Sequence, residues 1–238
     1  MTLTADQQDI DTRFLGFTIS PHEECAVEEA VRLVELHGGA STVLTLGAEV
    51  AIDQLRDALA LGVDRAILLE TDGREWDPGA TAAAIVGAVN EEWVEGREYD
   101  LLLFGNEAAD SGDYQVGVRV AHGLDLPCVT GIKQLEVRDG SILARREAND
   151  GWEVFEVRLP AVVTVKEGIN LPRYPSVPGR LRARRKDVQR IPSSGTAAGL
   201  RKLRLVLQKE PESTVEILGS GADATPRIVE VLQGLGLV

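Results

Sequence analysis

The chain has 238 residues, 44% of them hydrophobic, and a formal net charge of −13 at pH 7. This length and apolar content predict one substantial core with a small appendage and disfavour two domains of equal size. The acidic balance argues against nucleic acid as the main partner, because phosphate binding needs a basic surface. Two cysteines far apart in the chain predict neither a disulfide framework nor a metal site.

The charge is unevenly distributed along the chain. Residues 180–209 hold ten of the 25 basic side chains and a single acid, Asp187. The remainder is strongly acidic, as in proteins kept soluble at high salt, so we expect a halophilic source. The first residues have neither the basic nor the apolar region of a secretory signal, and no run approaches the roughly 18 apolar residues of a membrane span. We therefore expect a cytoplasmic protein.

The first 124 residues alternate between strand and helix patterns. Helix starts are marked by Ser20-Pro21, with Glu23 placed to close a capping box, and by Asp77-Pro78. Glycines end several elements, as at Gly38 and Gly62. Such alternation predicts an α/β fold with a Rossmann-like, mostly parallel sheet and helices on both faces. The expected strands are 14–19, 42–46, 65–69 and 101–104, and the expected helices are 20–37, 49–61, 77–93 and a further one that ends at residue 124.

The pattern changes after residue 131 to the alternation of antiparallel strands. Segments 133–137, 141–147 and 152–157 are separated by Asp139-Gly140 and Asn149-Asp150-Gly151, which are hairpin-turn residues. An antiparallel meander is predicted here, followed by a buried strand at 159–165. The C-terminal extension has expected strands at 203–207 and 215–218 and a helix from Thr225-Pro226. We predict an α/β nucleotide-binding domain over 1–192, and over 193–238 an arm that packs on a partner.

One loop stands out as a ligand site. The apolar run 101–104 stops at Gly105, and a polar segment follows before the helical spacing resumes. Ligands of open α/β sheets bind at the carboxyl ends of strands, where a helix start offers free N–H groups to an anion. The alternative is an ordinary connecting loop, since it contains neither a GxGxxG nor a P-loop spacing.

No arrangement of catalytic side chains can be argued from the sequence. The three histidines, His22, His37 and His122, are isolated, and no Ser/His/Asp set, HExxH, CxxC or carboxylate pair is indicated. These absences weaken a hydrolase interpretation, and no catalytic residue is predicted.

Three stretches together resemble the β subunit of electron transfer flavoproteins. They are the helix start SPHEECAVEEA at 20–30, the acidic loop from Gly105 to Gly117 with its closing Gln-Val-Gly, and residues 159–186, which read LPAVVTV, then NLPRYPSVPG, then a basic segment. The third is the most specific. The resemblance extends from about residue 14 and weakens beyond residue 195.

The resemblance implies a non-catalytic electron carrier. Its partner would be an α subunit, in a heterodimer that shares an FAD between the subunits, with AMP or a second FAD in the β-subunit pocket. The Gln-Val-Gly triplet is similar to the corresponding triplet in the FAD-binding branch of the family. That branch includes bifurcating and nitrogen-fixation-associated members. The residues that would bind the nucleotide are Thr45, Leu46, Gly47, Gly105, Asp110, Ser111, Gly112, Asp113, Gln115, Val116 and Gly117.

The resemblance also implies a recognition loop at 170–179. Val177 takes the place of the apolar anchor that inserts into an acyl-CoA or other dehydrogenase, and Tyr174 and Pro178 would hold the shape of the loop. Glu147 would face the flavin domain of the α subunit. An apolar side chain on a proline-stiffened loop loses little entropy on docking. Arg182 and Arg185 would steer acidic partners, and a membrane quinone oxidoreductase is a further expected partner. Alternatively, Val177 packs into its own domain, and the arginines form a solvated arm.

One departure from the family concerns the start of the chain. Members of the family begin with a strand of the type KVLVAVK, and this sequence begins about where the following hairpin ends. Three explanations stay open: a late start, replacement of the strand by another segment, or weak nucleotide binding.

Two other functions compete with the carrier hypothesis. The first is a stand-alone adenine-nucleotide-binding regulatory module, since a fold does not fix a function. The second is a nucleotide-hydrolysing or adenylating enzyme, which the lack of a phosphate grip and of a clear base disfavours.

Overall fold

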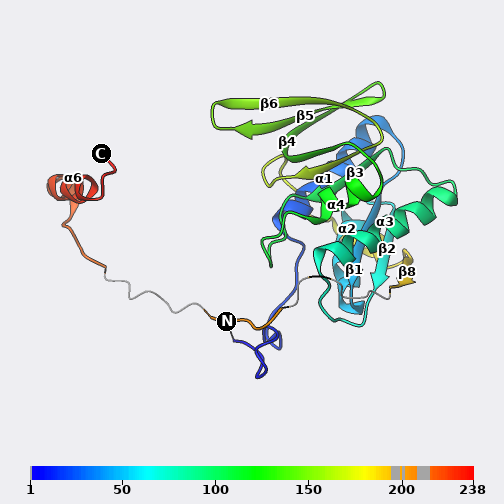
Figure 1. Cartoon of the computed structure of the whole chain (residues 1–238), viewed down its shortest axis with the longest axis horizontal. Coiled ribbons are helices and arrows are strands. Elements are labelled where there is room, and N and C mark those ends of the chain that lie inside the picture. The colour runs from blue at the N-terminus through cyan, green and yellow to red at the C-terminus, as the bar shows by residue number, and fades with distance from the viewer. Residues whose placement is uncertain (1, 194–198, 200–201, 208–214) are drawn as a thin grey trace. The chain divides into compact units, whose positions relative to one another are not determined.

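A computed structural model describes residues 2–193, 199, 202–207 and 215–238. The chain forms two compact units, Thr12–Arg201 and the pair Met1–Asp11 with Lys202–Val238. The larger unit holds the named strands and most of the helices (Figure 1). Its elements are α1 (Pro21–His37), β1 (Thr42–Gly47), η1 (Glu49–Ala51), α2 (Ile52–Leu61), β2 (Arg65–Glu70), α3 (Pro78–Val94), β3 (Leu101–Gly105), α4 (Val116–Gly123), β4 (Cys128–Arg138), β5 (Ser141–Ala148), β6 (Gly151–Arg158), β7 (Ala161–Val165), α5 (Val177–Ala183) and β8 (Val188–Pro192).

The strands form two sheets. The first is fully parallel, in the order β1-β2-β8, and the second has the order β3-β7-β4-β5-β6. In the second sheet, β7 pairs in parallel with both β3 and β4, while β4, β5 and β6 form an antiparallel meander. Figure 1 shows this meander at one end of the unit and β1, β2 and β8 at the other. The predicted α/β class and meander are confirmed, although the parallel strands lie in two sheets instead of one.

Helices join the two sheets on both faces. On one face, α3 and α4 pack against strands of both sheets, in a core that includes Ile67, Ile85, Leu102 and Val162. On the other face, α1 contributes Cys25 and Ala26 to the core of the second sheet and Val31 to a cluster beside β1 and α2. The helices therefore hold β1 and β3 on either side of one interior space.

The start of α1 follows only part of its sequence signal. Pro21 stands at the first helical position and Ser20 is extended, as predicted, but the Ser20 side chain makes no capping hydrogen bond. The hydroxyl of Ser20 and the Oε2 atom of Glu23 are both buried without a hydrogen-bond partner among the described residues. The predicted capping box is wrong, because Glu23 turns toward the interior. Asp77, in contrast, caps α3 by accepting hydrogen bonds from the backbone N–H groups of Gly79 and Ala80.

Three other sequence predictions are corrected by the structure, and one strand was not predicted. Residues 14–19 are not a strand, and neither are the segments 203–207 and 215–218. Their apolar side chains are largely exposed, so nothing compensates the entropy of an ordered strand. The basic run contains a strand that the sequence analysis missed, β8, which pairs with β2.

Hydrogen bonds connect the two segments of the smaller unit. Leu205 donates its N–H to the Gln7 carbonyl, and Gln8 donates to the Leu203 carbonyl. Its C-terminal part contains η2 (Gly221–Ala224) and α6 (Thr225–Gly234), the helix predicted from the sequence, which has no buried residue. Of the predicted arm 193–238, residues 194–198, 200–201 and 208–214 lie outside the described part of the chain. Among the helices that the structure describes, none has the length and apolarity to span a membrane.

A buried carboxylate ties α3 to the starts of two strands. Glu92, only 4% exposed, accepts hydrogen bonds from Arg97, from Arg65 at the start of β2, and from the hydroxyl of Tyr99 just before β3. The hydrogen bonds from Arg97 and Arg65 lower the pKa of Glu92 to about 2. This cluster therefore fixes the amino ends of strands from both sheets against one helix.

The Glu92 cluster predicts acid lability. Because the folded-state pKa of Glu92 lies below its ordinary value of 4.5, its stabilisation is complete above about pH 4.5 and is lost as the pH falls toward 2. The contribution at neutral pH is at most about 3 kcal/mol. Urea unfolding between pH 7 and 3 should show that Glu92→Gln is less stable at pH 7 and loses less stability on acidification. The exposed neighbour in Glu91→Gln is the control, and parallel losses in all three proteins would contradict this assignment.

Candidate functional site

Most of the predicted nucleotide residues border a cavity of about 650 Å³ between β1 and β3. The cavity runs along both strands and ends at their carboxyl edge, where α1 and α4 begin. Of the residues predicted to bind nucleotide, seven line it and four do not. Thr45, Leu46, Gly105, Asp113, Gln115, Val116 and Gly117 line the cavity, whereas Gly47, Asp110, Ser111 and Gly112 lie outside its lining.

The loop between β3 and α4 is a tight, acidic turn. The N–H of Ala108 donates to the Asp113 carbonyl at 2.9 Å, and the N–H of Gly112 donates to the Ala108 carbonyl at 2.8 Å. Gly112 has φ +68°, a conformation that favours glycine, and Asp110 and Ser111 are exposed at the tip. The turn therefore presents backbone and carboxylate groups beside the cavity and exposes its tip to solvent.

A cation at this loop was missed by the sequence analysis. Arg119 donates to Gln115 Oε1 from its Nε and Nη2 atoms, at 3.1 and 2.8 Å, and Gln115 donates to Asp113 Oδ1 at 3.0 Å. The i,i+4 spacing of Gln115 and Arg119 on a helix was the available signal. Arg119 is exposed and supplies positive charge in an otherwise acidic segment.

Gly117 allows α4 to approach the sheet closely. A Cβ atom at this position would lie 2.8 Å from Thr164 Cγ2 and 3.3 Å from Phe104 Cβ. Thr164, in β7, donates its hydroxyl to Asn106 and accepts the N–H of Gly131, so it is held in place. In dinucleotide-binding folds, a glycine at the start of a helix likewise allows close helix–strand packing.

Glu23 closes the carboxyl end of the cavity. Its carboxylate lies against Gly105, so close that a Cβ atom there would be 2.3 Å from Glu23 Cδ. Burial raises the pKa of Glu23, and the nearby Asp110 adds to this effect. The unpaired carboxylate oxygen of Glu23 could accept a hydrogen bond from a donor group of a bound ligand.

The predicted recognition loop is exposed at its tip. The side chain of Tyr174 is 96% exposed and that of Val177 is 72% exposed. Ser176 caps the short helix α5 by accepting the N–H of Gly179, so Val177 occupies the first helical position and Pro178 the second. The alternative that Val177 packs into its own domain is therefore wrong.

Buried carboxylates of α1 anchor the base of this loop. Arg173 binds Glu28 through its backbone N–H and its guanidinium at 3.0 to 3.2 Å, and it also pairs with Glu35. Asn170 donates to Glu29 Oε2 at 2.9 Å and to the Cys25 carbonyl. The hydrogen bonds that Arg173 donates to the carboxylates of Glu35 and Glu28 raise the pKa of Arg173 above its ordinary value. The acidic pair in the AVEEA stretch is thus a structural anchor, which the sequence motif alone did not reveal.

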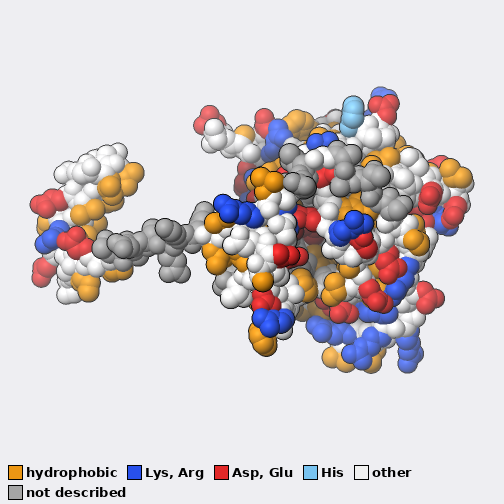
Figure 2. Space-filling view, turned by 60° about the horizontal axis from the view of Figure 1, so that its bottom comes forward, with side chains coloured by type: hydrophobic (Ala, Val, Ile, Leu, Met, Phe, Trp, Pro, Cys, Tyr) orange, Lys and Arg blue, Asp and Glu red, His pale blue; other side chains and the backbone are white. Residues whose placement is uncertain are grey.

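The remaining predicted partner residues also lie at the surface. Glu147, near the end of β5, pairs with Lys133 at 3.1 Å and has a half-exposed side chain. Arg182 and Arg185 are exposed, while Lys186 folds back to donate to the Val63 and Asp64 carbonyls. Figure 2 shows Lys and Arg side chains gathered along one edge of the larger unit, with acidic side chains spread over the rest of this face. Of the predicted basic run, Arg201 and Lys209 lie outside the described residues.

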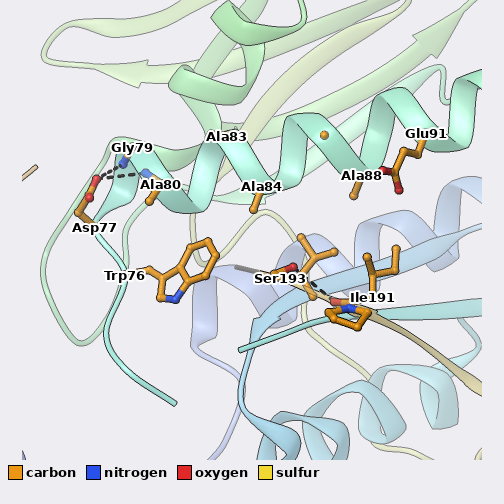
Figure 3. Close-up of a pocket in the computed structure, with 13 residues that line it drawn as sticks. Trp76, Asp77, Gly79, Ala80, Ala83, Ala84, Ala88, Glu91, Ile191 and Ser193 are labelled. Atoms are coloured by element: carbon orange, nitrogen blue, oxygen red, sulfur yellow. Dashed lines mark hydrogen bonds between the residues drawn. The ribbon is translucent and has the colours of Figure 1, made fainter. Parts of the chain in front are cut away.

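A second cavity, of about 550 Å³, lies beside α3 and the end of β8. Figure 3 shows Trp76 and Ile191 facing the small side chains Ala80 and Ala84 of α3. None of the predicted site residues lines it. Most of its lining residues are small or apolar, so it has few side chains that could bind a polar ligand or act in catalysis.

Comparison with known proteins identifies the class that this fold and site define. The family model for the electron transfer flavoprotein domain matches residues 10–195. The chain belongs to this family.

Several curated relatives carry the name electron transfer flavoprotein subunit beta. The chain is 39% identical to that of Bacillus subtilis over 173 residues, which are 73% of this chain and 66% of that protein. It is 37% identical to the protein of Thermoanaerobacterium thermosaccharolyticum, over 73% of this chain and 65% of the relative, and 35% identical to that of Syntrophomonas wolfei, over 85% and 79%. The match thus spans slightly less than two thirds of the first two relatives.

The packing at Gly117 predicts a large effect of one methyl group. Gly117→Ala should lower the free energy of unfolding by roughly 1–3 kcal/mol, because the new Cβ overlaps Thr164. Gly87→Ala, in α3, is the matched control, since a Cβ there meets nothing within 4 Å and should be neutral or stabilising. Urea denaturation of both variants checks this, and equal stabilities would show that α4 does not pack as described.

The anchor of the recognition loop predicts a local loss of order. Glu28→Gln should speed amide hydrogen exchange in residues 170–179 and lower the melting temperature, because Arg173 loses its buried partner. Glu35→Gln, which removes the more exposed partner, should have a much smaller effect. If both substitutions had the same small effect, the Glu28 contact would not be the anchor.

Proposed function

We propose that this chain is the β subunit of an electron transfer flavoprotein. The observation that carries the proposal is the loop 170–179, which lies in the matched region and presents an exposed Val177 on a base fixed by Arg173 and Glu28. A rigid loop with an apolar tip binds a partner with a small entropy loss and releases it quickly. Those are the properties that a mobile carrier needs. Nothing in the described residues favours the regulatory module or the nucleotide-cleaving enzyme.

The cofactors of the proposal are an FAD shared with an α subunit, and AMP or a second FAD in the β-subunit pocket. The flavin supplies the electron-transfer chemistry, and the protein sets its environment. The carboxyl end of the 650 Å³ cavity lies at the strand ends, which is where such folds bind nucleotides. Arg119 is outside the lining but is hydrogen-bonded to the lining residue Gln115, and it would offer a cation for a phosphate. Thr45, Leu46, Gly105, Asp113, Gln115, Val116 and Gly117 would surround it. Four other predicted residues do not line the cavity and would not contact the nucleotide in the conformation described: Gly47, Asp110, Ser111 and Gly112.

The proposed partners are an α subunit, acyl-CoA or other dehydrogenases, and a membrane quinone oxidoreductase. Tyr174, Val177 and Pro178 would meet the dehydrogenase, with Arg182 and Arg185 attracting acidic partners. Glu147 would face the flavin domain of the α subunit, and the arm 193–238 would pack on that subunit, for which the exposed apolar side chains of α6 offer a surface. A cytoplasmic location fits the two free thiols, Cys25 and Cys128, and a halophilic source fits the charge of −13.

The proposal is tested by co-expression with an α subunit from the same genome. A purified heterodimer with one FAD and one AMP would place the chain in the ordinary branch, and two FAD would place it in the FAD-binding branch. A complex with one FAD and no nucleotide in the β subunit would support the pairing with an α subunit and contradict the proposed nucleotide site. No complex at all would contradict the carrier function for the chain as given.

The recognition loop predicts a separable defect. In the heterodimer, Val177→Asp should leave the cofactor content unchanged and slow flavin reduction by the dehydrogenase about tenfold or more, because a charge replaces the apolar contact. Leu171→Asp is the control, since Leu171 is also largely exposed but lies outside the tip. Equal rates in both variants would show that Val177 is not the docking residue.

A further inference from the structure

Helix α5 and the residues that follow it present four arginines without partners. Residues 180–186 read RLRARRK and contain five basic side chains and no acid. Lys186 folds back onto the backbone, but four guanidinium groups are exposed, and among the described residues none of them forms a hydrogen bond or an ion pair. Several arginines elsewhere in the larger unit pair with carboxylates, as Arg65, Arg97 and Arg190 do. We call the four unpaired residues the arginine cluster: Arg180, Arg182, Arg184 and Arg185.

Contacts with α2 hold the arginine cluster on an outward face. Gly179 and Ala183, four residues apart on α5, are both buried, and a Cβ atom on Gly179 would overlap the carbonyl oxygen of Ala60. Arg56 of α2 donates a hydrogen bond to the Ala183 carbonyl at 2.9 Å. Lys186 donates to two backbone carbonyls just after α2. These contacts fix α5, so the arginine cluster lies on the outer side of a well-held element.

Apolar side chains are exposed beside the arginine cluster. The exposed fractions are 96% for Tyr174, 72% for Val177 and 55% for Leu181. Val177 and Leu181 lie about one helical turn apart on α5, on the side opposite the buried Gly179 and Ala183. The outer side of α5 therefore carries apolar groups next to unpaired positive charges. We call Tyr174, Val177 and Leu181, together with the arginine cluster, the basic-apolar surface.

We propose that the basic-apolar surface binds a bilayer that contains anionic phospholipids. Guanidinium groups donate paired hydrogen bonds to phosphate oxygens, and the negative surface of such a bilayer attracts each basic side chain. Tyrosine and aliphatic side chains enter the boundary between headgroups and acyl chains. Helix α5 has seven residues, too few to span a bilayer, so the attachment is peripheral. The inference goes beyond the proposed function and is independent of it, because neither a flavin nor an α subunit takes part.

The negative charge of the whole chain does not prevent this contact. A net charge of −13 repels an anionic surface at low salt, but charges further than about 8 Å from that surface are largely screened at physiological ionic strength. Glu28 and Glu35, two acids at the base of the loop 170–179, are already paired with Arg173. Asp187 is the single acid of residues 180–209. The chain would therefore bind in one orientation, with the basic-apolar surface on the membrane.

Two other anionic partners fit the basic-apolar surface less well. A nucleic acid would engage the arginine cluster through its phosphates but would leave Val177 and Leu181 in contact with water. An acidic protein would need an apolar pocket ringed by carboxylates at matching positions, whereas a bilayer offers phosphates above an apolar layer over its whole area. Because Val177 is also the proposed docking residue for a dehydrogenase, a chain bound to a bilayer through this surface would not dock a dehydrogenase at the same time.

The proposal is tested by sedimentation of the full chain with two kinds of vesicle, one of phosphatidylcholine alone and one with phosphatidylglycerol as about a third of its lipid. Binding is expected only to the second kind and should weaken as salt is added. Arg184→Gln with Arg185→Gln should weaken this binding roughly tenfold or more, because each basic side chain contributes about a fivefold change in affinity. The matched control, Arg138→Gln with Arg158→Gln, removes the same charge from the antiparallel meander and should not change the binding.

Leu181→Gln separates a bilayer from other anionic partners. It should weaken vesicle binding several-fold and leave retention on heparin, a soluble polyanion, unchanged, because only the bilayer has an apolar layer. Vesicle binding that is insensitive to Leu181→Gln would overturn the proposal in favour of a general polyanion site. Equal binding to both kinds of vesicle, or equal losses in the two double variants, would overturn it as well, and no binding to either kind would overturn it in favour of an acidic protein. The substituted side chains are all exposed, so each variant should keep the melting temperature of the unmodified chain.

Discussion

The contact of Glu28 with Arg173 links the interior of the fold to the exposed loop 170–179. Glu28 is buried on α1, and burial removes water from its carboxylate. The guanidinium and the backbone N–H of Arg173 donate hydrogen bonds to it in place of water, and these offset most of the cost of desolvation. The same helix packs on both sheets and ends its first turn with Glu23 against Gly105. Helix α1 is therefore the element that sets the position of the loop 170–179 relative to the strand ends.

The strand ends impose a second constraint on function. Parallel strands bring their carboxyl ends to one edge, and here the ends of β1 and β3 meet the starts of α1 and α4. The same edge carries Glu107, Asp110 and Asp113, which repel a phosphate, and Arg119, which attracts one. A nucleotide proposed at this edge would rely on backbone N–H groups and on Arg119 for its phosphates, more than on the acidic tip of the loop.

Local signals in the sequence predicted most of the helices and strands, because the ends and the periodicity of each element depend on residues within it or next to it in the sequence. Pro21, Pro78 and the glycines after helices mark boundaries through backbone conformation, and Asp77 does so through its side-chain cap. The alternation of 141–147 and 152–157 marks a half-buried meander. Strand β8 was missed because its exposed, basic sequence forms a strand only through the edge of β2. The capping box failed for a related reason, since tertiary packing turned Glu23 inward.

The candidate site was predictable in position and less so in detail. The stop at Gly105 and the resemblance at Gln115 to Gly117 located the loop, and seven of the eleven predicted nucleotide residues line the cavity. The roles of Gly117 in packing and of Glu28 in anchoring depend on contacts with Thr164 and Arg173, which lie far away in sequence. No local pattern reports such contacts.

The carrier role is tested most directly by the reduction of flavin, followed by stopped-flow absorbance. An acyl-CoA dehydrogenase and its substrate would be mixed with the α subunit alone, and with the α subunit plus this chain. The account predicts rapid reduction only when this chain is present, because its loop supplies the docking contact. Equal rates with and without the chain would contradict it.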